Sequence, residues 1–160
     1  MKAQIGTVKA EMQPASLESH IGFWLRFVSN HVSQSFARKV EGSGVTVAEW
    51  VMLREMYEAG ETSPSRLAAS SGLTRGAVSK LVERLVQKKL ATRAEADEDR
   101  RYQDVKLTAA GRALVPKLAA LADRNEEEFF SCLSAEERRS LMVTLRKLAA
   151  ANKLKKIPVN

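Results

Sequence analysis

Residues Ser63 to Leu90 read SPSRLAASSGLTRGAVSKLVERLVQKKL, and the organisation of the whole chain follows from this stretch. Ser63 followed by Pro64 predicts a helix start, because the serine oxygen can accept a free backbone N–H and proline loses no hydrogen bond in the first turn. That helix is short, since the glycine of Ser70-Ser71-Gly72 allows a turn that other residues resist. Thr74 is a natural cap for a second helix. This second helix has four apolar residues at helical spacing: Val78, Leu81, Val82 and Leu85.

The side of the second helix opposite its apolar stripe is small and polar. It carries Gly76, Ser79, Lys80, Glu83 and Gln87, with Arg75 beside them. Between residues 62 and 93, seven lysines and arginines stand against one acidic residue, which is a local net charge of +6. The two expected helix N-termini already attract anions through free N–H groups and the helix dipole. A run of charges is often only a solvated surface, but its coincidence with both helix starts indicates DNA binding.

The chain as a whole is basic and has the composition of one ordinary domain. Its 160 residues are 44% hydrophobic, enough for a real core. The 26 basic and 19 acidic residues give a net charge of +7, which favours nucleic acid or an anionic membrane surface as a partner. Aromatic residues make up 6%, too few for extensive stacking on single strands. A single cysteine, Cys132, and the lack of an apolar run of membrane length predict a cytoplasmic protein.

Further helices are predicted on both sides of the opening stretch. Thr46 and Glu49 match a capping box, which predicts a helix over residues 47–59. Three helices with short connections form the core of a helix-turn-helix domain. Longer helices, each with an apolar stripe, are predicted over residues 16–40, 108–133 and 134–152. Their surplus of apolar surface suggests a dimer interface.

Beyond the second short helix, the pattern changes to that of a β-hairpin. Residues 91–96 and 101–107 can each be extended, and the polar segment between them predicts an exposed turn. Near the tip, the Asp99 carboxylate can hold a neighbouring guanidinium extended, that of Arg100 or Arg101, and such an arginine suits the narrow minor groove. For an isolated hairpin, an exposed ion pair of little energetic consequence is the alternative. The residues expected to face inward are Val105 and Leu107.

A second line of side chains lies beside the apolar stripe of the first long helix: His20, Trp24, Phe27 and His31. Eleven residues separate the two histidines, which is roughly 16 Å along a helix. Ligands of one zinc ion lie about 2 Å from it, so the histidines of one chain cannot share a metal, although a site completed by another subunit stays open. The line either packs against another helix or walls a small-molecule pocket.

The order of these elements resembles the MarR family of bacterial transcription regulators. The segment LAASSGLTRGAVSKLVERLVQKKL is similar to the family's helix-turn-helix, and DEDRRYQDVKLTAAG is similar to its wing and the helix start behind it. Asp99 and Arg101, followed by Leu107-Thr108 and Gly111, stand at the family's spacing. The resemblance covers residues 17–150. It implies a mainly α fold with a small β-hairpin wing, in which a winged helix-turn-helix core is joined to long N- and C-terminal dimerisation helices.

The resemblance also implies a division of roles within a single MarR-like domain, residues 1–160. Residues 45–107 would form the DNA-binding lobe, and residues 16–40 and 108–152 the dimerisation lobe. Arg101 would enter the minor groove with Asp99 bracing it. Ser63 and Ser65 would contact phosphates, and the residues from Thr74 to Lys80 would face the major groove. The full expected DNA-binding set is Ser63, Ser65, Thr74, Arg75, Gly76, Ser79, Lys80, Arg84, Asp99, Arg100 and Arg101.

Members of this family commonly bind small aromatic acids or phenols between the dimer helices and the DNA-binding lobe. By resemblance, such an effector site would be lined by His20, Trp24, Phe27, His31, Trp50, Arg54 and Tyr57, with core packing as the alternative for most of them. Two positions depart from the family. Ser71 stands where helix-turn-helix sequences usually have an apolar residue, which predicts looser packing of the turn. Cys132 lies far from the first helix, where the family's peroxide sensors carry their cysteine, so a thiol switch of that kind is not expected.

The sequence therefore predicts a double-stranded DNA-binding transcription regulator that is sequence-specific, acts as a homodimer on a roughly palindromic operator, and is a ligand-responsive repressor. The alternative is a winged-helix protein-interaction module that no longer binds DNA. An enzyme is disfavoured, because no cluster pairs a nucleophile with a base and no glycine-rich phosphate loop follows a strand. No catalytic residues, no cofactor and no metal are expected.

Overall fold

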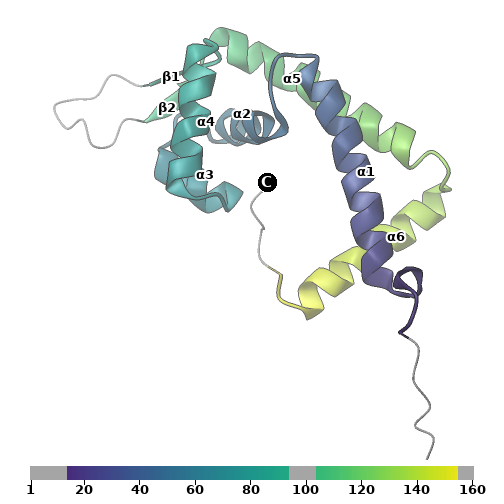
Figure 1. Ribbon diagram of the computed structural model, residues 1–160. Helices are drawn as coiled ribbons and strands as arrows, with labels where there is room; N and C mark the ends of the chain where they lie inside the picture. Colours follow the sequence, from purple (N-terminus) through teal and green to yellow (C-terminus); the bar gives the residue numbers. More distant parts are fainter. Residues whose placement is uncertain (1–13, 94–103, 155–160) are drawn as a thin grey trace, which may run out of the picture. The chain divides into compact units, whose positions relative to one another are not determined.

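The computed structural model describes residues 14–93 and 104–154. This part of the chain is mainly helical, with a two-stranded hairpin, as predicted (Figure 1). The chain divides into two compact units, residues 1–31 and 32–160, which meet inside the first long helix. The α-helices are α1 (Ile21–Glu41), α2 (Val47–Ala59), α3 (Pro64–Ser71), α4 (Arg75–Gln87), α5 (Ala109–Phe129) and α6 (Ala135–Ala151), and the strands are β1 (Ala91–Arg93) and β2 (Val105–Leu107).

In the first unit, the predicted helix over residues 16–40 begins later than expected. A 3-10 turn at Leu17–Ser19 comes first, and His20 is extended, with ψ of 126°, before α1 starts. The Ser19 hydroxyl donates to the carbonyl of Ser16 at 2.6 Å, and the Trp24 indole N–H donates to the carbonyl of Glu18 at 2.8 Å. Side chains thus take backbone acceptors that a continuous helix would use, which separates the turn from α1.

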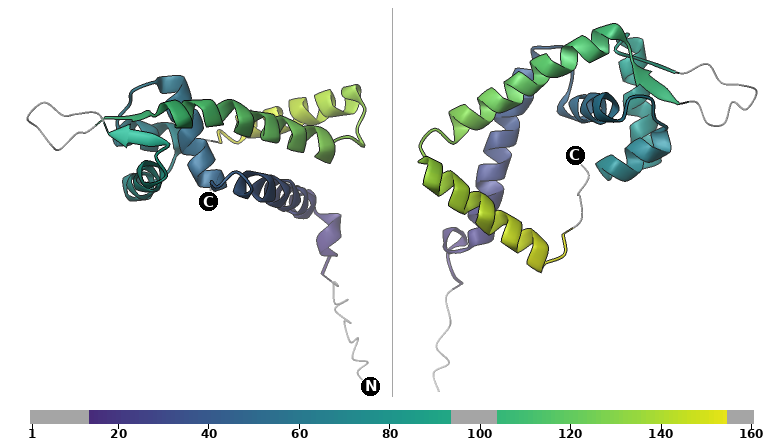
Figure 2. Two further views of the ribbon diagram at one scale, coloured as in Figure 1. Left: turned by 90° about the horizontal axis from the view of Figure 1, so that it is seen from above. Right: turned by 180° about the vertical axis from the view of Figure 1, so that it is seen from behind.

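The core of the second unit is built around α2. This helix contacts α3, α4, α5 and β2, and the right view of Figure 2 shows α2 between α5 and the pair formed by α3 and α4. The predicted helix starts are confirmed: Thr46 and Glu49 form a capping box, and Ser63, Thr74 and Thr108 each accept a backbone N–H. The buried apolar residues are Val40, Val45, Met52, Leu53, Met56, Leu67, Val78, Leu81, Val82, Leu85, Ala91, Val105, Leu107, Val115 and Leu118.

The turn between α3 and α4 is well packed, so the expectation of looseness at Ser71 was wrong. Ser71 is buried, and its hydroxyl donates to the carbonyl of Leu67 at 2.6 Å while accepting the N–H of Leu73 at 3.3 Å. Gly72 follows in the left-handed region at φ 75°, which suits glycine. A serine can replace an apolar residue here because both hydrogen-bonding roles of its hydroxyl are satisfied inside the turn.

The hairpin is antiparallel and is anchored at its base. Ala91 pairs with Leu107, and Arg93 pairs with Val105. Thr62, just before α3, exchanges two backbone hydrogen bonds with Val105 at 3.0 and 2.7 Å. Val105 and Leu107 are buried, as predicted. The predicted outer parts of the strands and the turn between them fall within residues 94–103, outside the described residues.

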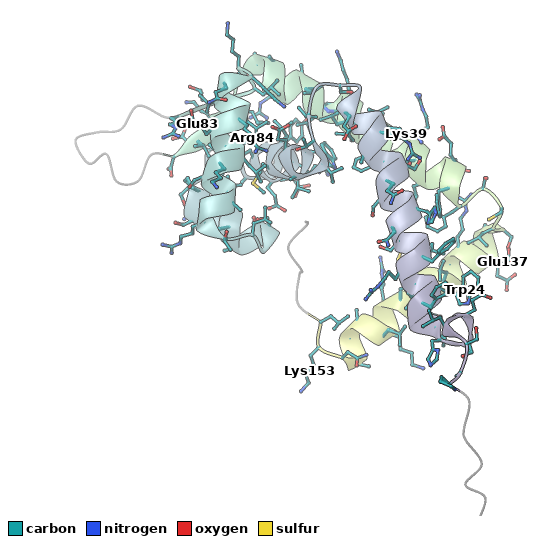
Figure 3. The ribbon with its side chains drawn as sticks, in the orientation of Figure 1. Trp24, Lys39, Glu83, Arg84, Glu137 and Lys153 are labelled. Carbon is teal, nitrogen blue, oxygen red and sulfur yellow. The ribbon has the colours of Figure 1, made fainter. Side chains whose placement is uncertain are left out.

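A polar contact joins α1 to α5 within the second unit. The buried Asn125 amide donates to the carbonyl of Val32 at 3.2 Å and accepts from the Lys39 ammonium at 3.1 Å. Lys39, labelled in Figure 3, also lies 2.7 Å from the Glu128 carboxylate. The second half of α1 and the second half of α5 are therefore held together by directional bonds.

The two C-terminal helices follow the prediction with one change. α6 begins with the predicted capping box at Ser134 and Glu137 and ends within one residue of the expected position. α5 ends at Phe129, four residues before its predicted end. The Arg138 Nε donates to the carbonyl of Phe130 at 3.0 Å, so a side chain of α6 takes the acceptor at this turn. Among the described helices, none has the length and apolar character needed to cross a bilayer.

The C-terminal end of α4 is fixed by a buried carboxylate. Glu49 of α2 is 1% exposed, and its Oε2 accepts from the backbone N–H of Thr46 at 2.8 Å and from the Lys88 ammonium at 2.7 Å. Lys88 also donates to the carbonyl of Gly44 at 2.8 Å. Burial alone would raise the pKa of Glu49, but the hydrogen bonds from Lys88 and Thr46 and the charges of Lys88 and Arg84 outweigh it, so the pKa is lowered.

The start of α5 approaches the end of α4 closely. The Thr108 N–H donates to the carbonyl of Leu90 at 3.1 Å, and its hydroxyl donates to the carbonyl of Lys89 at 2.8 Å. A Cβ on Gly111 would lie 1.9 Å from the Leu90 carbonyl oxygen. Glycine is therefore required at position 111 by backbone contact.

We expect Gly111→Ala to lower the free energy of unfolding by about 1–3 kcal/mol, because the new methyl group would force the backbone of Leu90 aside. Chemical denaturation of the purified protein measures this. Gly76→Ala is the matched control, since a Cβ there has no atom within 4 Å, and it should leave stability unchanged or raise it by up to about 1 kcal/mol. Equal stability of Gly111→Ala and wild type would contradict the close contact.

We expect Glu49→Gln to cost about 1–3 kcal/mol at pH 7, because a buried acceptor of charge-assisted hydrogen bonds is lost. The Glu49 pKa is lower in the folded state, so its stabilisation is present above the unfolded value of about 4.5 and is lost as the pH falls through the folded value. The difference between wild type and variant should therefore shrink below about pH 4.5. Denaturation curves from pH 7 to pH 3 test this, with Glu61→Gln as the control because Glu61 is half exposed. A stability difference between wild type and Glu49→Gln that does not change with pH would contradict the proposed dependence on the Glu49 pKa.

Candidate nucleic-acid interface

The starts of α3 and α4 are built as predicted. The Ser63 Oγ accepts the N–H of Arg66 at 3.3 Å, and the Thr74 Oγ1 accepts the N–H of Ala77 at 3.2 Å. Each hydroxyl accepts a bond in its capping role, which leaves its proton to donate to another acceptor. Other N–H groups of each first turn have no partner inside their helix. Ser63 and Ser65 are half-buried and Thr74 is exposed. The arrangement can hold anions such as phosphate groups.

The exposed face of α4 carries the other residues of the predicted DNA-binding set that the structure describes. Val78, Leu81, Val82 and Leu85 are buried on one side of the helix, and the predicted contacts on the other side are all exposed: Arg75, Gly76, Ser79, Lys80 and Arg84. Within the described residues, no carboxylate lies in ion-pair distance of Arg75, Lys80 or Arg84. The space around Gly76 is open, so α4 can approach a surface closely at its first turn.

Within the part of the chain that the structure describes, two of the seven basic residues counted between positions 62 and 93 form ion pairs with other side chains. Lys88 is bound to the buried Glu49, and Arg93 is paired with Glu83 of α4 at 2.7 Å. Sequence reasoning missed both pairs. The partners of Lys88 lie 39 and 44 positions away, and those separations carry no local signal.

The predicted wing contacts lie outside the described residues: Asp99, Arg100 and Arg101. The structure describes the base of the wing, where β1 and β2 pair and Thr62 is bonded to Val105. The contacts of the wing tip stay a prediction.

The residues predicted to line an effector site fall into both units. In the first unit, Trp24 and Phe27 are about half exposed with their ring centroids 5.9 Å apart, and the Phe27 and His31 rings are 4.4 Å apart. The His20 Nδ1 lies 3.1 Å from the carbonyl of Ser16, and the His31 Nδ1 lies 2.8 Å from that of Phe27. Both histidines thus bond to their own helix or turn.

In the second unit, α2 supplies the three remaining residues of that predicted set. Trp50 and Tyr57 are partly buried against the core, which agrees with the core-packing alternative. The Arg112 guanidinium lies 5.5 Å from the centre of the Tyr57 ring, and Arg54 forms an ion pair with Glu58 at 2.9 Å. A shared pocket of the two groups stays a prediction. Within the described residues, no group of three or more histidine, cysteine or acidic side chains is arranged to hold a metal ion.

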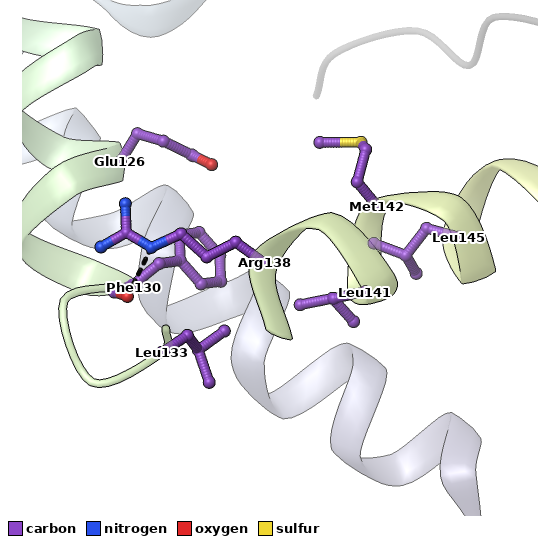
Figure 4. A pocket seen from close by; sticks show the side chains of 7 residues that line it. All are labelled: Glu126, Phe130, Leu133, Arg138, Leu141, Met142 and Leu145. Atoms are coloured by element: carbon purple, nitrogen blue, oxygen red, sulfur yellow. Dashed lines mark hydrogen bonds between the residues drawn. The ribbon is translucent and has the colours of Figure 1, made fainter. Parts of the chain in front are cut away.

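A small hollow lies between the end of α5 and α6 (Figure 4). Its volume is about 70 Å³, whereas pockets for drug-sized ligands are about 300–1,000 Å³. The hollow is mostly apolar, and Arg138 at its edge is already bonded to Glu127 at 2.8 Å and to the carbonyl of Phe130. It is lined by Glu126, Phe130, Leu133, Arg138, Leu141, Met142 and Leu145.

Known proteins are similar to this chain in fold and in sequence. Residues 43–101, which begin in the α1–α2 connection and include α2, α3, α4 and β1, match the MarR family. A protein assigned as the transcriptional regulator of the hcr operon of Thauera aromatica is 29% identical over 140 residues, which are 87% of this chain and 84% of that protein.

Solved structures agree along most of the chain. BpsR from Bordetella bronchiseptica, whose DNA binding is regulated by 6-hydroxynicotinic acid, superposes with a TM-score of 0.73 at 27% identity, over 84% of this chain and 98% of that one. MepR from S. aureus, solved in complex with DNA, has a TM-score of 0.70 at 26% identity, over 82% and 98%. The winged helix-turn-helix segment of the chain thus matches the MarR family of transcription regulators, a family of DNA-binding proteins and not of enzymes, and the fold along most of the chain is that of these relatives.

Proposed function

We propose that this protein is a homodimeric, sequence-specific regulator that binds a roughly palindromic duplex operator and represses transcription by occluding a promoter. The observation that carries the proposal is the two-sided α4, with one side buried and the other basic, polar and exposed. Residues 45–107 act as the DNA-binding lobe, and residues 16–40 and 108–152 as the dimerisation lobe.

In this proposal α4 enters the major groove, which is wide enough for an α-helix. Gly76 lets the backbone approach the base edges, and Arg75 and Lys80 can donate to guanine O6 and N7. Ser79 can donate or accept, and Arg84 lies further along the same exposed face. Ser63, Ser65 and Thr74 contact phosphates or the groove edge at the two helix starts. The MepR complex with DNA supports this use of the fold.

The wing supplies the second groove contact. Arg101 inserts into the minor groove, Asp99 braces its guanidinium, and Arg100 adds positive charge. The base of the wing is well suited to carry such a contact, because the Thr62 bridge ties β2 to the segment before α3. Both groove contacts would then move with one lobe.

Dimerisation would place two copies of α4 about 34 Å apart, one turn of DNA. α6 presents apolar side chains that its own chain leaves open, with Leu141 and Leu145 each 38% exposed and Leu148 43% exposed. A second copy of the chain would cover this face and the hollow beside it.

A small aromatic or phenolic effector would control the affinity of the protein for DNA, as the regulation of BpsR by 6-hydroxynicotinic acid suggests. The site would draw on His20, Trp24, Phe27, His31, Trp50, Arg54 and Tyr57. The effector would bind more tightly to a dimer conformation whose recognition helices do not match adjacent major grooves. The difference between its affinities for the two conformations would set how far it shifts the equilibrium between them. We place this activity in the cytoplasm, where promoter DNA lies in bacteria.

Lys80→Ala is expected to weaken operator binding by about 1–3 kcal/mol. A loss confined to the operator would mean that Lys80 contacts a base. An equal loss on random duplex, with a salt slope flatter by about one unit, would mean a phosphate contact. Fluorescence anisotropy over a salt series measures both, and Lys147→Ala, the same charge change on α6, is the control.

Unchanged affinity of Lys80→Ala on both DNAs would remove α4 from the interface. Salt-independent affinity of the wild type, or no preference for any promoter fragment over random duplex, would instead favour the protein-interaction module.

Leu145→Asp should raise the dissociation constant of the dimer at least about a hundredfold, because an unpaired carboxylate would be buried in the interface. Sedimentation equilibrium measures this, and circular dichroism checks that the monomer stays folded. Val143→Asp adds the same charge on the opposite side of α6, where the side chain is 63% exposed, and should leave the dimer intact. An unaltered dimer in Leu145→Asp would place the interface elsewhere.

A further inference from the structure

Glu83 is the acidic residue on the exposed face of α4, and it is held by the wing. Its Oε2 accepts a hydrogen bond from a terminal nitrogen of the Arg93 guanidinium at 2.7 Å. Arg93 is the last residue of β1 and pairs with Val105 across the hairpin. Figure 3 shows Glu83 on the side of α4 where the hairpin lies. The pair therefore bridges the recognition helix and the base of the wing.

Stability does not account for this pair. The side chains of Arg93 and Glu83 are 47% and 50% exposed, and exposed ion pairs contribute little to folding. A carboxylate on this face is also unfavourable for a protein that binds DNA, because it repels phosphates. Its presence is explained if it orients a group that DNA needs.

The Arg93 guanidinium has the chemistry for that role. It carries five N–H donors in a planar fork, and within the described residues its side-chain hydrogen bond to Glu83 uses one terminal nitrogen. The remaining edge can bind two phosphate oxygens at once. A guanidinium held against α4 also loses less rotamer freedom on binding than a mobile one.

The position fits a phosphate between the two grooves. Glu83 lies about one helical turn beyond Ser79 and Lys80 on α4, and Arg93 is the residue from which the wing departs. In the proposed binding mode, α4 occupies the major groove and the wing the adjacent minor groove, and a phosphate strand runs between them.

We infer that Arg93 is a further DNA contact, which binds a backbone phosphate between the grooves, and that Glu83 is a positioning residue that holds its guanidinium in place. The inference rests on the proposed DNA-binding function. It adds two residues that were not in the expected DNA-binding set.

The test is whether Glu83→Ala raises or lowers the affinity of the full-length protein for DNA. If Glu83 positions Arg93, removing this negative charge weakens binding, whereas simple electrostatics demands tighter binding. Arg93→Ala is expected to weaken binding roughly five- to tenfold on operator and random duplex alike, with a salt slope smaller by about one unit. Glu83→Ala should weaken binding roughly two- to fivefold, with part of that change in slope.

The double variant completes the cycle. In the Arg93→Ala background, Glu83→Ala should tighten binding, because only the repulsion by Glu83 remains to be removed. Glu58→Ala is the matched control, since Glu58 is an exposed carboxylate paired with an arginine on α2, and it should leave binding unchanged or slightly tighter. All variants should melt within about 3 °C of the wild type, as expected for exposed pairs.

Three results would overturn the inference. The first is tighter DNA binding by the Glu83→Ala single variant, and the second is an unchanged salt slope in Arg93→Ala. The third is a loss of affinity in Glu83→Ala that is confined to one operator base pair, which would make Glu83 a base-reading residue. In each case, salt-dependent and sequence-specific binding by the wild type would leave the proposed function standing. A wild type that binds no duplex would remove both.

Discussion

The apolar stripe of α4 is the contact on which the proposed DNA-binding surface depends. Val78, Leu81, Val82 and Leu85 are all buried in the core that α2 centres. Burying one such side chain contributes about 1.5–3 kcal/mol, whereas an exposed ion pair contributes about 0–1 kcal/mol. Burial therefore decides which side of α4 faces outward, and the polar side chains are displayed as a consequence.

Directional contacts then fix the ends of the helix, since an apolar stripe alone permits small rotations and shifts. At the C-terminal end, the Lys88 ammonium joins Glu49 of α2 to the carbonyl of Gly44. At the N-terminal end, Ser71 closes the turn from α3. Hydrogen bonds to a buried carboxylate or in a buried turn are costly to break, so these contacts hold α4 in one orientation.

Contacts of α5 connect the helix-turn-helix to the long helices. Gly111 lets the first turn of α5 touch the backbone of Leu90 just after α4, and Asn125, further along α5, is bonded to Val32 and Lys39 of α1. α5 is thus in contact with the end of the recognition helix near its start and with α1 near its end. In the proposed dimer, a shift of these helices would change the spacing of the two copies of α4.

The sequence by itself determined the elements and their caps. Hydrophobic spacing and capping residues are local, so α2 was predicted with its observed bounds, α3 and α4 were predicted with their observed starts, and Thr108 and Ser134 marked the starts of α5 and α6. The outward face of α4 also followed, because helix geometry puts it opposite the stripe. The late start of α1 and the early end of α5 were missed, since side chains of Ser19, Trp24 and Arg138 take backbone acceptors there.

Only the tertiary structure decided which charges on that surface are engaged. Lys88 and Arg93 look alike in the sequence, yet one is bound to a buried carboxylate and the other bridges the wing to α4. It also decided that Ser71 fits its turn and that Gly111 is required by a neighbouring carbonyl. Such contacts join residues whose separation along the chain carries no periodic signal, and their geometry exists only after the core has brought the elements together.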